Sequence, residues 1–435
     1  MWLVYFSMAI KKSKTPNRNK NLEKFLSVFS ICLLIVAWYL GGLRPNNSQA
    51  QFFEHITSAG QEVVEVSPNL YQIVSSSSEA HSTQSNTDGE PKAEKWVSFG
   101  NGIGYGGELT IGAVFTQSGV VETISLLSSK ETSSYFAKIV EEKLPESLLG
   151  KNIKTAIHID AISGATLTSD AYSHALDQAA DPVREAIYGY RLSEQASTWS
   201  YFKWLDAAAL VLFAVAVWVN RTRSEHKVKM NVTLLAVSTL IFGFHSASLY
   251  SASTMGGLLY GSWISGVANY TPFILLALSI GYIFYYNRNV YCQSLCPFGA
   301  VQQCLAKVGN AKSSPVRHSF FVWFPRVLLL ITLCLGAYFR SPAAFVYEPF
   351  GIAFGMIGGM YLFVLTVMII LTSLVVRRPW CQSLCPINAM TDFLIFNKNW
   401  VKQVRSQKSK KSRSNTPRAP RKSVMSNEVV KHDKE

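Results

Sequence analysis

The stretch Asp160-Ala-Ile-Ser-Gly-Ala-Thr166-Leu-Thr-Ser169 lies between an alternating segment, 154–159, and a segment of helical pattern that begins at Asp170. This order predicts a short strand, a tight turn and the start of a helix. The Gly-Ala pair lets backbone N–H groups approach an anion closely, and the helix start adds partial positive charge. Such a turn can hold a phosphate, and the Thr166 hydroxyl can become a phosphoester anchor. An ordinary strand and capped helix is the alternative interpretation.

A glycine-rich stretch precedes this turn, over residues 97–111. Five of its residues are Gly, and they surround Tyr105 and lead into a strand that begins at Glu108. Glycine at this density permits close approach of the backbone to a planar ligand. The stretch therefore predicts a hairpin that contributes to a binding site.

Further strands and helices are predicted around this hairpin. Residues 46–70 predict an amphipathic helix, and residues 119–126 predict a strand. A helix follows Glu131 and Thr132 and ends near Leu144. This mixture of elements predicts an α+β domain.

Apolar residues make up 49% of the 435-residue chain, and they gather in six blocks. Each block is long enough, or nearly so, to cross about 30 Å of hydrocarbon as a helix. The blocks are 25–40, 204–219, 232–250, 272–286, 320–337 and 352–376. We therefore predict an all-α bundle of six transmembrane helices.

Basic residues set the orientation of these helices, because Lys and Arg are retained on the cytoplasmic side. With six spans, all the basic loops fall on one side, so both termini are predicted to be cytoplasmic in a multi-pass protein of the inner (plasma) membrane. The predicted organisation is a basic N-terminus 1–24, a first helix 25–43, an extracytoplasmic α+β domain 44–200, a five-helix membrane domain 201–396 and a disordered basic tail 397–435.

The formal net charge of +14 is concentrated in these loops and in the tail. A basic chain can bind nucleic acid, but a membrane protein gains about 1 kcal/mol per basic residue near anionic lipid. We therefore predict membrane lipid, and no nucleic acid, as the partner of these charges.

Four of the seven cysteines form a repeat, aromatic-Cys-Gln-Ser-Leu-Cys-Pro, at 291–297 and again at 380–386. Two predicted helices separate the copies, which places both on the cytoplasmic side, where thiols stay reduced. Cys at i and i+4 share one face of a helical turn, and the proline ends it, so both sulfurs are expected at the membrane edge. Four thiolates suit an iron–sulfur cluster or Zn²⁺, and inert buried cysteines are the alternative. The predicted metal ligands are Cys292, Cys296, Cys381 and Cys385.

Together these motifs resemble a known family. Asp-x-x-Ser-Gly-Ala-Thr166 is similar to the flavinylation signature of FMN-binding domains in the sodium-pumping quinone reductase, in Rnf complexes and in NosR-type membrane flavoproteins. Gly-Tyr105-Gly-Gly-Glu and Glu131-Thr132 resemble the elements that precede the signature, although Ser133 replaces a usual Pro. The cysteine pairs resemble the Cys-x-x-x-Cys-Pro pairs of NosR-type proteins and of membrane flavoproteins found beside reductive dehalogenases. The ferredoxin-like domain of NosR-type proteins is not recognised after Trp400, which favours the shorter, dehalogenase-associated class.

The resemblance implies FMN joined to Thr166 through its phosphate. It also implies FMN contacts at Asp160, Ser163, Gly164, Ala165, Tyr105, Gly106, Gly107, Glu131 and Thr132. The cysteines are then expected to hold an iron–sulfur cluster or another iron centre. A flavin transferase is expected as the maturation partner.

A flavin on one side and a metal centre on the other predict an electron-transfer component of an oxidoreductase system. The expected donor is menaquinol, ubiquinol or a cytoplasmic carrier, and the expected acceptor is an extracytoplasmic reductase. No catalytic residue is assigned. A redox sensor, regulator or maturation factor with the same cofactors is the alternative, and a solute transporter that does not need its cysteines is a third interpretation.

Overall fold

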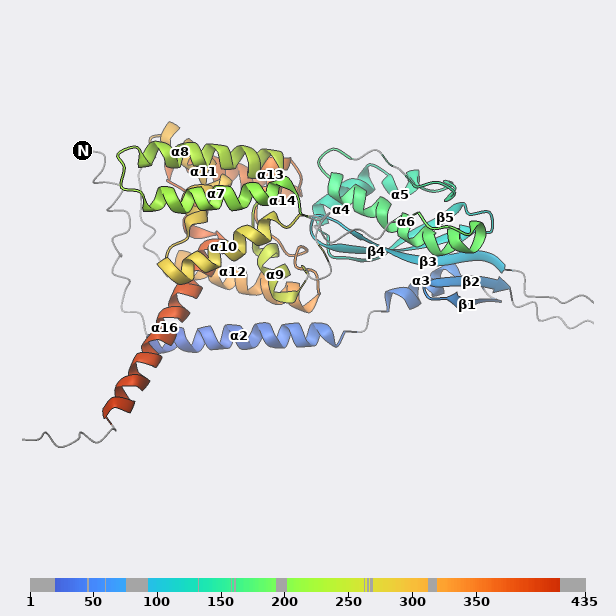
Figure 1. The fold of residues 1–435 in the computed structure, drawn as a ribbon, viewed down its shortest axis with the longest axis horizontal. Coiled ribbons are helices and arrows are strands. Elements are labelled where there is room, and N and C mark those ends of the chain that lie inside the picture. Colours follow the sequence, from blue (N-terminus) through green and yellow to red (C-terminus); the bar gives the residue numbers. More distant parts are fainter. Residues whose placement is uncertain are drawn as a thin grey trace, which may run out of the picture.

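The computed structural model describes most of the chain in two units, an α+β unit and a helical unit (Figure 1). The described residues are 20–44, 47–58, 60–75, 93–131, 133–157, 159, 162–192, 202–261, 263, 266, 269–311 and 319–414. Asp160 and Thr132, both predicted to contact the flavin, lie outside these ranges.

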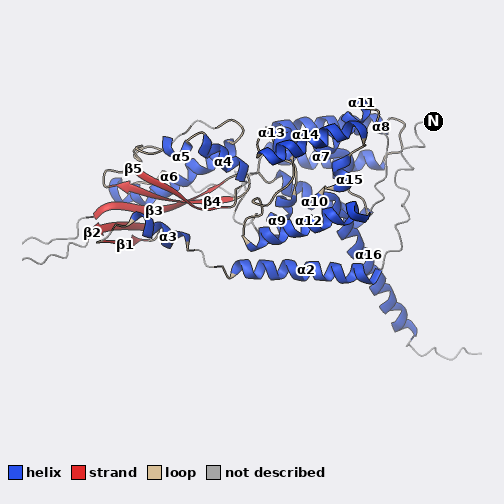
Figure 2. Ribbon diagram, turned by 180° about the vertical axis from the view of Figure 1, so that it is seen from behind, coloured by secondary structure: helices blue, strands red, loops and turns tan. Residues whose placement is uncertain are grey.

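The α+β unit is built on a five-stranded antiparallel sheet whose strands neighbour one another in chain order. The strands are β1 Gln61–Ser67, β2 Leu70–Ser75, β3 Ala93–Ile103, β4 Glu108–Thr116 and β5 Val121–Ser129. The helices of this unit are α3 Ser48–Ile56, α4 Ser133–Glu141, α5 Leu144–Ser147 and α6 Thr166–Tyr188. Figure 2 shows the sheet and helices of this unit at one end of the molecule.

The two faces of the sheet have separate cores. Alternate residues of β4, such as Leu109 and Ile111, are fully buried against α6, and Phe52 of α3 packs with Phe99 on the other face. Helix α6 comes very close to β3, because a Cβ on Gly102 would lie 1.8 Å from the carbonyl oxygen of Ala171. The predicted hairpin of glycines is confirmed, and its glycines serve helix packing as well as the turn.

Two predictions around the anchor turn are wrong. Residues 154–157 form no strand, because α6 side chains occupy their backbone groups: Asp177 accepts from the Ile157 N–H, and Arg184 donates to the Thr155 carbonyl (3.3 Å). The helix begins at Thr166 rather than Asp170, after Gly164 turns the chain at φ +84°. Part of the predicted amphipathic helix 46–70 is instead the hairpin of β1 and β2.

The helical unit contains the remaining helices. They are α2 Lys20–Gly42, α7 Trp204–Arg221, α8 Lys227–Ser238, the π-helix η2 Thr239–His245, α9 Ala252–Tyr260, α10 Thr271–Tyr286, the π-helical turn η3 Tyr291–Leu295, α11 Pro297–Val308, α12 Ser319–Tyr338, α13 Phe350–Gly355, α14 Met360–Val375, α15 Pro379–Ser383 and α16 Pro386–Ser414. The prediction of a disordered tail from residue 397 is corrected in part, because α16 continues to Ser414.

Four helices of the described residues are long and apolar enough to cross a membrane: Asn21–Gly42, Trp204–Arg221, Lys227–His245 and Phe320–Tyr338. Helices Thr271–Tyr286 and Met360–Val375 are apolar but shorter. The predicted sixth block is divided in two, because Met356 (φ +54°) and Gly358 (φ +157°) end α13 before α14 begins. All six blocks contain apolar helix, and four of them reach the length of a span.

The α+β unit lies at one end of the helical unit (Figures 1 and 2). Helix α2 leads to it, and the last turn of α2 packs closely on α12, since a Cβ on Gly41 would lie 2.5 Å from the carbonyl oxygen of Ala337. Several contacts between described residues join the units directly, and a Cβ built on Gly266 would lie 2.6 Å from Ile103 Cδ1. The Tyr105 hydroxyl donates to the Ala247 carbonyl (2.8 Å), and Gly164 lies against Ile357.

Candidate cofactor sites

The first candidate site is the anchor turn, residues 162–166. Thr166 is exposed and is the first residue of α6, so its hydroxyl lies beside the helix N-terminus. The Lys138 ammonium donates to the Ser163 carbonyl (2.6 Å) and stands 3.0 Å from a Cβ built on Gly164. Backbone N–H groups, a helix start and a lysine therefore surround one exposed hydroxyl, which is a suitable environment for a phosphate. Sequence reasoning missed Lys138.

The buried hydroxyl of Thr168 lies two residues further along α6. It is fully buried, and its Oγ1 has no hydrogen-bond partner among the described residues. A buried polar atom of this kind is costly unless a ligand or water satisfies it. This orphaned atom in the first turn of α6 is compatible with a polar ligand at the anchor turn.

The glycine turn between β3 and β4 faces the same region. The Gly104 N–H donates to the Gly107 carbonyl (2.9 Å), and the Gly106 N–H donates to Glu131 Oε1 (2.8 Å). A Cβ on Gly104 would lie 1.9 Å from Glu131 Oε2, so only Gly fits here. Glu131 is 3% exposed and holds the turn in place. The resemblance implied a contact between Glu131 and the flavin, and the structure shows its carboxylate bonded to the turn.

Two tyrosines stand at this turn. The rings of Tyr105 and Tyr135 have centroids 5.0 Å apart. Burial, together with the neighbouring Tyr135 and carboxylates, raises the pKa of Tyr105 well above its usual range, and burial beside Glu131 raises the pKa of Tyr135 to about 12. Both phenols therefore stay neutral and offer ring faces, and the Tyr105 hydroxyl is held by the Ala247 carbonyl.

A cavity of about 520 Å³ lies between the two units. Its α+β wall includes Tyr105, Tyr135 and Lys138, and its helical wall includes Leu249 and Glu348. This volume is in the range of small-molecule and cofactor sites. The anchor turn borders the cavity, because Lys138 lines the cavity and also contacts the turn. Of the predicted flavin contacts, Tyr105 is among the residues that line this cavity, and Ser163 borders it through Lys138. Gly106, Gly107, Glu131, Ala165 and Thr166 are not among the lining residues, and the helical unit forms the opposite wall.

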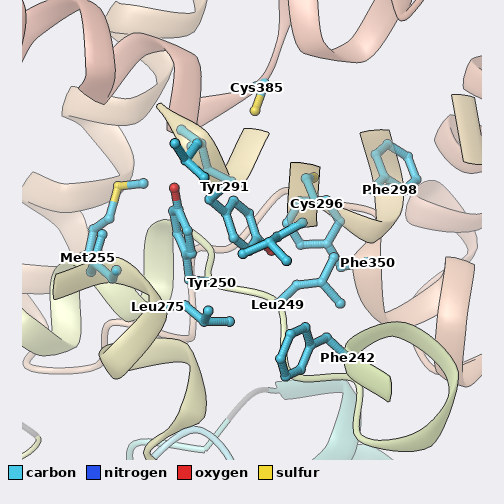
Figure 3. Packing of buried hydrophobic residues seen from close by; sticks show 14 of the residues in the cluster. Phe242, Leu249, Tyr250, Met255, Leu275, Tyr291, Cys296, Phe298, Phe350 and Cys385 are labelled. Atoms are coloured by element: carbon cyan, nitrogen blue, oxygen red, sulfur yellow. The ribbon is translucent and has the colours of Figure 1, made fainter. Parts of the chain in front are cut away.

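The second candidate site is the thiol cluster, Cys292, Cys296, Cys381 and Cys385. Cys296 and Cys385 are each 7% exposed in the core of the helical unit, and the other two pack against the same core. Burial raises the pKa of Cys385, and the neighbouring charges of Cys381, Cys292 and Cys296 raise it further, so the four thiols are electrostatic neighbours. Figure 3 shows Cys296 and Cys385 within the apolar packing. The four cysteines thus lie in the core of the helical unit, and their predicted position at the edge of the membrane stays a prediction.

Both motifs end at the start of a helix inside the bundle. Cys296 caps α11, and its sulfur accepts from the Gly299 N–H (3.4 Å). Cys385 precedes the first residue of α16, and the Asn388 N–H bonded to it lowers its pKa against the effect of burial. Two helix N-termini therefore direct partial positive charge toward the sulfurs, which favours thiolates.

Two further side chains support the thiols. Arg378, whose charge lowers the pKa of Cys292 against burial, donates to the Cys292 carbonyl (3.5 Å) and to Gln303. Gln302, 1% exposed, donates to the Cys381 sulfur (3.7 Å) and accepts from the Trp380 N–H (3.1 Å). Sequence reasoning missed both roles, although both residues stand next to the motifs.

The copies of the repeat have diverged at one position. Arg378 stands three residues before Cys381, and Asn289 stands three residues before Cys292. Asn289 is buried and donates to the Tyr250 hydroxyl (3.2 Å) and to Thr391 (3.0 Å). In the first copy of the repeat, this position therefore holds an uncharged side chain that forms hydrogen bonds in the core. In the second copy, it holds a positive charge beside the sulfurs.

Short segments connect the cavity with the thiol cluster. Leu249 lines the cavity, and the next residue, Tyr250, lies against Tyr291 with ring centroids 4.2 Å apart. Glu348 lines the cavity, and the preceding Tyr347 donates to the Leu384 carbonyl (3.3 Å). Both cysteine motifs thus contact segments that form the cavity wall.

In the part of the chain that the structure describes, no group of three or more His, Cys, Asp or Glu side chains is arranged to hold a metal ion. The four cysteines lie in one core, but their sulfurs are not arranged as the ligands of one metal ion. The donor set nevertheless fits an iron–sulfur cluster, because four buried thiols, one arginine and two helix N-termini can balance the charge of such a group.

Comparison with known proteins identifies two domains in the chain. Residues 104–181 match the FMN-binding domain family, and residues 268–315 and 358–403 match the 4Fe-4S binding domain family. The first match begins at the glycine turn and includes Thr166, and the two parts of the second contain the two cysteine pairs.

The chain is also similar to the regulatory protein NosR of Pseudomonas aeruginosa PAO1, with 25% identity over 232 residues. This match covers 49% of the chain and 32% of that relative, so the chain aligns with about a third of the relative's length. No solved structure matches the chain. The chain therefore contains an FMN-binding domain and a 4Fe-4S binding domain, and these similarities support a relationship to the NosR type of membrane flavoprotein.

Proposed function

We propose that the chain carries electrons through a membrane between FMN in the cavity and an iron–sulfur cluster on Cys292, Cys296, Cys381 and Cys385. FMN exchanges one or two electrons and an iron–sulfur cluster exchanges one, so the pair can join a two-electron carrier to a one-electron path. The observation that carries this proposal is that the segments forming the helical wall of the cavity also contact the two cysteine motifs. Tyr250 contacts Tyr291, and Tyr347 contacts Leu384, directly behind residues that line the cavity.

The residues of the chain have distinct tasks in this function. Thr166 holds the phosphate as an ester, with Lys138 beside it, and Tyr105 and Tyr135 supply ring faces in the cavity. Arg378 and the starts of α11 and α16 stabilise negative charge on the sulfurs. Leu249, Phe350 and Phe242 keep the intervening core apolar, which excludes water from the path (Figure 3).

The remaining assignments follow the same proposal. Residues 44–200 lie outside the inner (plasma) membrane, both termini lie in the cytoplasm, and all six apolar helices cross. The donor is menaquinol, ubiquinol or a cytoplasmic carrier, the acceptor is an extracytoplasmic reductase, and a flavin transferase attaches the FMN. The apolar helices and the domain matches support this arrangement.

Purified full-length protein tests the anchor and the cluster together. We expect flavin fluorescence that survives denaturing electrophoresis in the wild type, and its loss in Thr166→Ala. Thr155→Ala, an exposed threonine of the same unit, is the matched control and keeps the flavin. Iron analysis and electron paramagnetic resonance of the reduced protein report the cluster. A flavin that remains attached in Thr166→Ala, or wild-type protein without iron, contradicts the proposal.

A redox sensor is the second candidate, because the relative that matches is named a regulatory protein. The two functions differ in rate. A carrier reoxidises its reduced flavin rapidly when the terminal acceptor is added, whereas a sensor equilibrates slowly and changes its partner complex. Stopped-flow absorbance of the flavin separates the two.

A further inference from the structure

Glu348 is a buried carboxyl group in the wall of the cavity. It lies between α12 and α13, is 3% exposed, and its Oε1 accepts from the Ala252 N–H (2.5 Å) at the start of α9. Its second oxygen, Oε2, is buried and has no hydrogen-bond partner among the described residues. One oxygen is therefore fixed by the fold, and the other is left available beside the cavity.

The groups around Glu348 do not neutralise it. Tyr105, Tyr347, Tyr135 and Glu131 are the titratable side chains that surround it or its nearest neighbours, and none of them carries a positive charge. Lys138 and Glu141 also line the cavity, and neither forms an ion pair with Glu348 in the described structure. Burial raises the pKa of Glu348 to about 7, although the N–H of Ala252 lowers it. Both protonation states are therefore accessible near neutral pH.

We propose that Glu348 exchanges a proton with the occupant of the cavity through Oε2. The inference rests on the proposed function, in which that occupant is FMN and its electrons come from the cysteine-ligated centre. With FMN bound, Glu348 would give the proton on Oε2 to the ring as the ring takes up electrons, and would become a carboxylate. When the ring gives those electrons up, the proton would return to Oε2, so atoms and charge balance in both directions.

The position of the residue supports this role over a purely structural one. A carboxylate that only capped α9 would gain from staying ionised and from having both of its oxygens bound to N–H groups. Here Oε1 accepts from the Ala252 N–H, and the N–H groups of Tyr347 and Glu348 also lower the pKa of the carboxyl. Oε2 is nevertheless buried beside the cavity with no hydrogen-bond partner among the described residues. The arrangement leaves Oε2 able to donate when protonated and to accept when ionised.

The first measurement does not need the flavin. Infrared difference spectra of the full-length protein between pH 5 and pH 9 report the carbonyl band of a protonated carboxylic acid. We expect a band that is lost near neutral pH in the wild type and is absent in Glu348→Gln. The band remains in the control Glu141→Gln, because Glu141 is an exposed glutamate of the same cavity. A wild-type spectrum without this band, or a band that persists in Glu348→Gln, overturns the proposal.

The second measurement is the midpoint potential of the bound flavin as a function of pH. We expect the pH dependence near neutrality to change slope in the wild type, in Glu348→Asp and in Glu141→Gln, and to lose that change in Glu348→Gln. A Glu348→Gln protein that binds flavin and keeps the wild-type dependence overturns the proton-exchange role. Wild-type protein without flavin shows instead that the proposed function has failed, and the infrared band then still reports the state of Glu348.

Discussion

The two candidate cofactor sites are built in opposite ways. Thr166 is exposed at the first residue of a helix, and the residues around it are held by the α+β core behind them. The thiol cluster belongs to the main core of the helical unit, where Cys296 and Cys385 pack with Tyr291 and Phe298. We therefore expect that a substitution at the anchor turn can remove flavin attachment without destabilising the fold. A substitution in the thiol cluster is expected to change both metal binding and the stability of the helical unit.

The largest expected effect is at the thiol cluster. Cys385→Ala removes a ligand from the centre of the bundle, so we expect loss of most of the bound iron and a lower melting temperature of the full-length protein. Cys304→Ala, an exposed cysteine of α11, is the control and changes neither quantity. Iron analysis and thermal denaturation are the measurements. Full iron content in Cys385→Ala would contradict the assignment of Cys385 as a ligand and with it the contrast between the two sites.

A comparable loss is expected where the α+β unit is tightly packed. Gly102→Ala places a Cβ 1.8 Å from the Ala171 carbonyl oxygen, so α6 must move away from β3. We expect destabilisation of more than about 3 kcal/mol and a loss of covalent flavin. Gly281→Ala, where an added Cβ meets nothing within 4 Å, serves as the control. Thermal denaturation followed by flavin fluorescence measures both effects.

The buried Glu348 gives a pH-dependent effect of intermediate size. Its pKa is raised by burial, so between about pH 4.5 and pH 7 the folded state binds more protons than the unfolded state, and stability falls as pH rises. Above pH 7 the full burial penalty, up to about 3 kcal/mol, is present. We expect Glu348→Gln to be more stable than the wild type at pH 8 and not at pH 4. Equal melting temperatures at both pH values would contradict this.

A smaller effect distinguishes the two copies of the cysteine repeat. Arg378→Gln removes a positive charge near the sulfurs, so we expect the midpoint potential of the cluster to fall by on the order of 50 mV. Asn289→Ala removes uncharged hydrogen bonds, including the one from the Cys292 N–H (3.3 Å), so we expect a smaller shift of the potential. Redox titration followed by electron paramagnetic resonance measures both variants. Equal shifts would show that the copies are equivalent.

The smallest expected change in stability is at the anchor itself. Thr166→Ala removes an exposed hydroxyl, so the free energy of unfolding of the flavin-free protein should stay within about 0.5 kcal/mol of the wild type. The same substitution removes the covalent flavin. Chemical denaturation of matched flavin-free samples checks the first statement, and a large destabilisation would show that the anchor is part of the core.

Local sequence patterns predicted the parts of the fold that depend on local chemistry. The glycine hairpin, the strand after it and the apolar helices follow from turn residues and from hydrophobic runs. The predicted strand 154–159 failed because its backbone groups bond to Asp177, Ser173 and Arg184 of α6, which are distant in sequence. The break before α14 depends on the backbone at Met356, which no hydrophobic pattern reveals.

The residues of the candidate sites also divide into those found from local sequence motifs and those that depend on contacts with distant segments. Thr166 and the four cysteines lie in motifs that can be read along the chain, and the structure gathers the four cysteines in one core. Lys138, Gln302 and Glu348 could not be found this way, because each acquires its role only through a contact with a remote segment. Arg378 gave a weak signal, since it directly precedes Pro379 and the second motif.

The order of the motifs along the chain governs when the thiol cluster can exist. Cys292 and Cys381 are separated by α11, α12, α13 and α14, so a growing chain that has not yet reached Pro379 possesses two of the four cysteines of the thiol cluster. On the proposed function, iron is therefore expected to bind after the last apolar helix has joined its neighbours. The proposed iron–sulfur cluster would then bind to a helical bundle that has already assembled, as the last step of biogenesis.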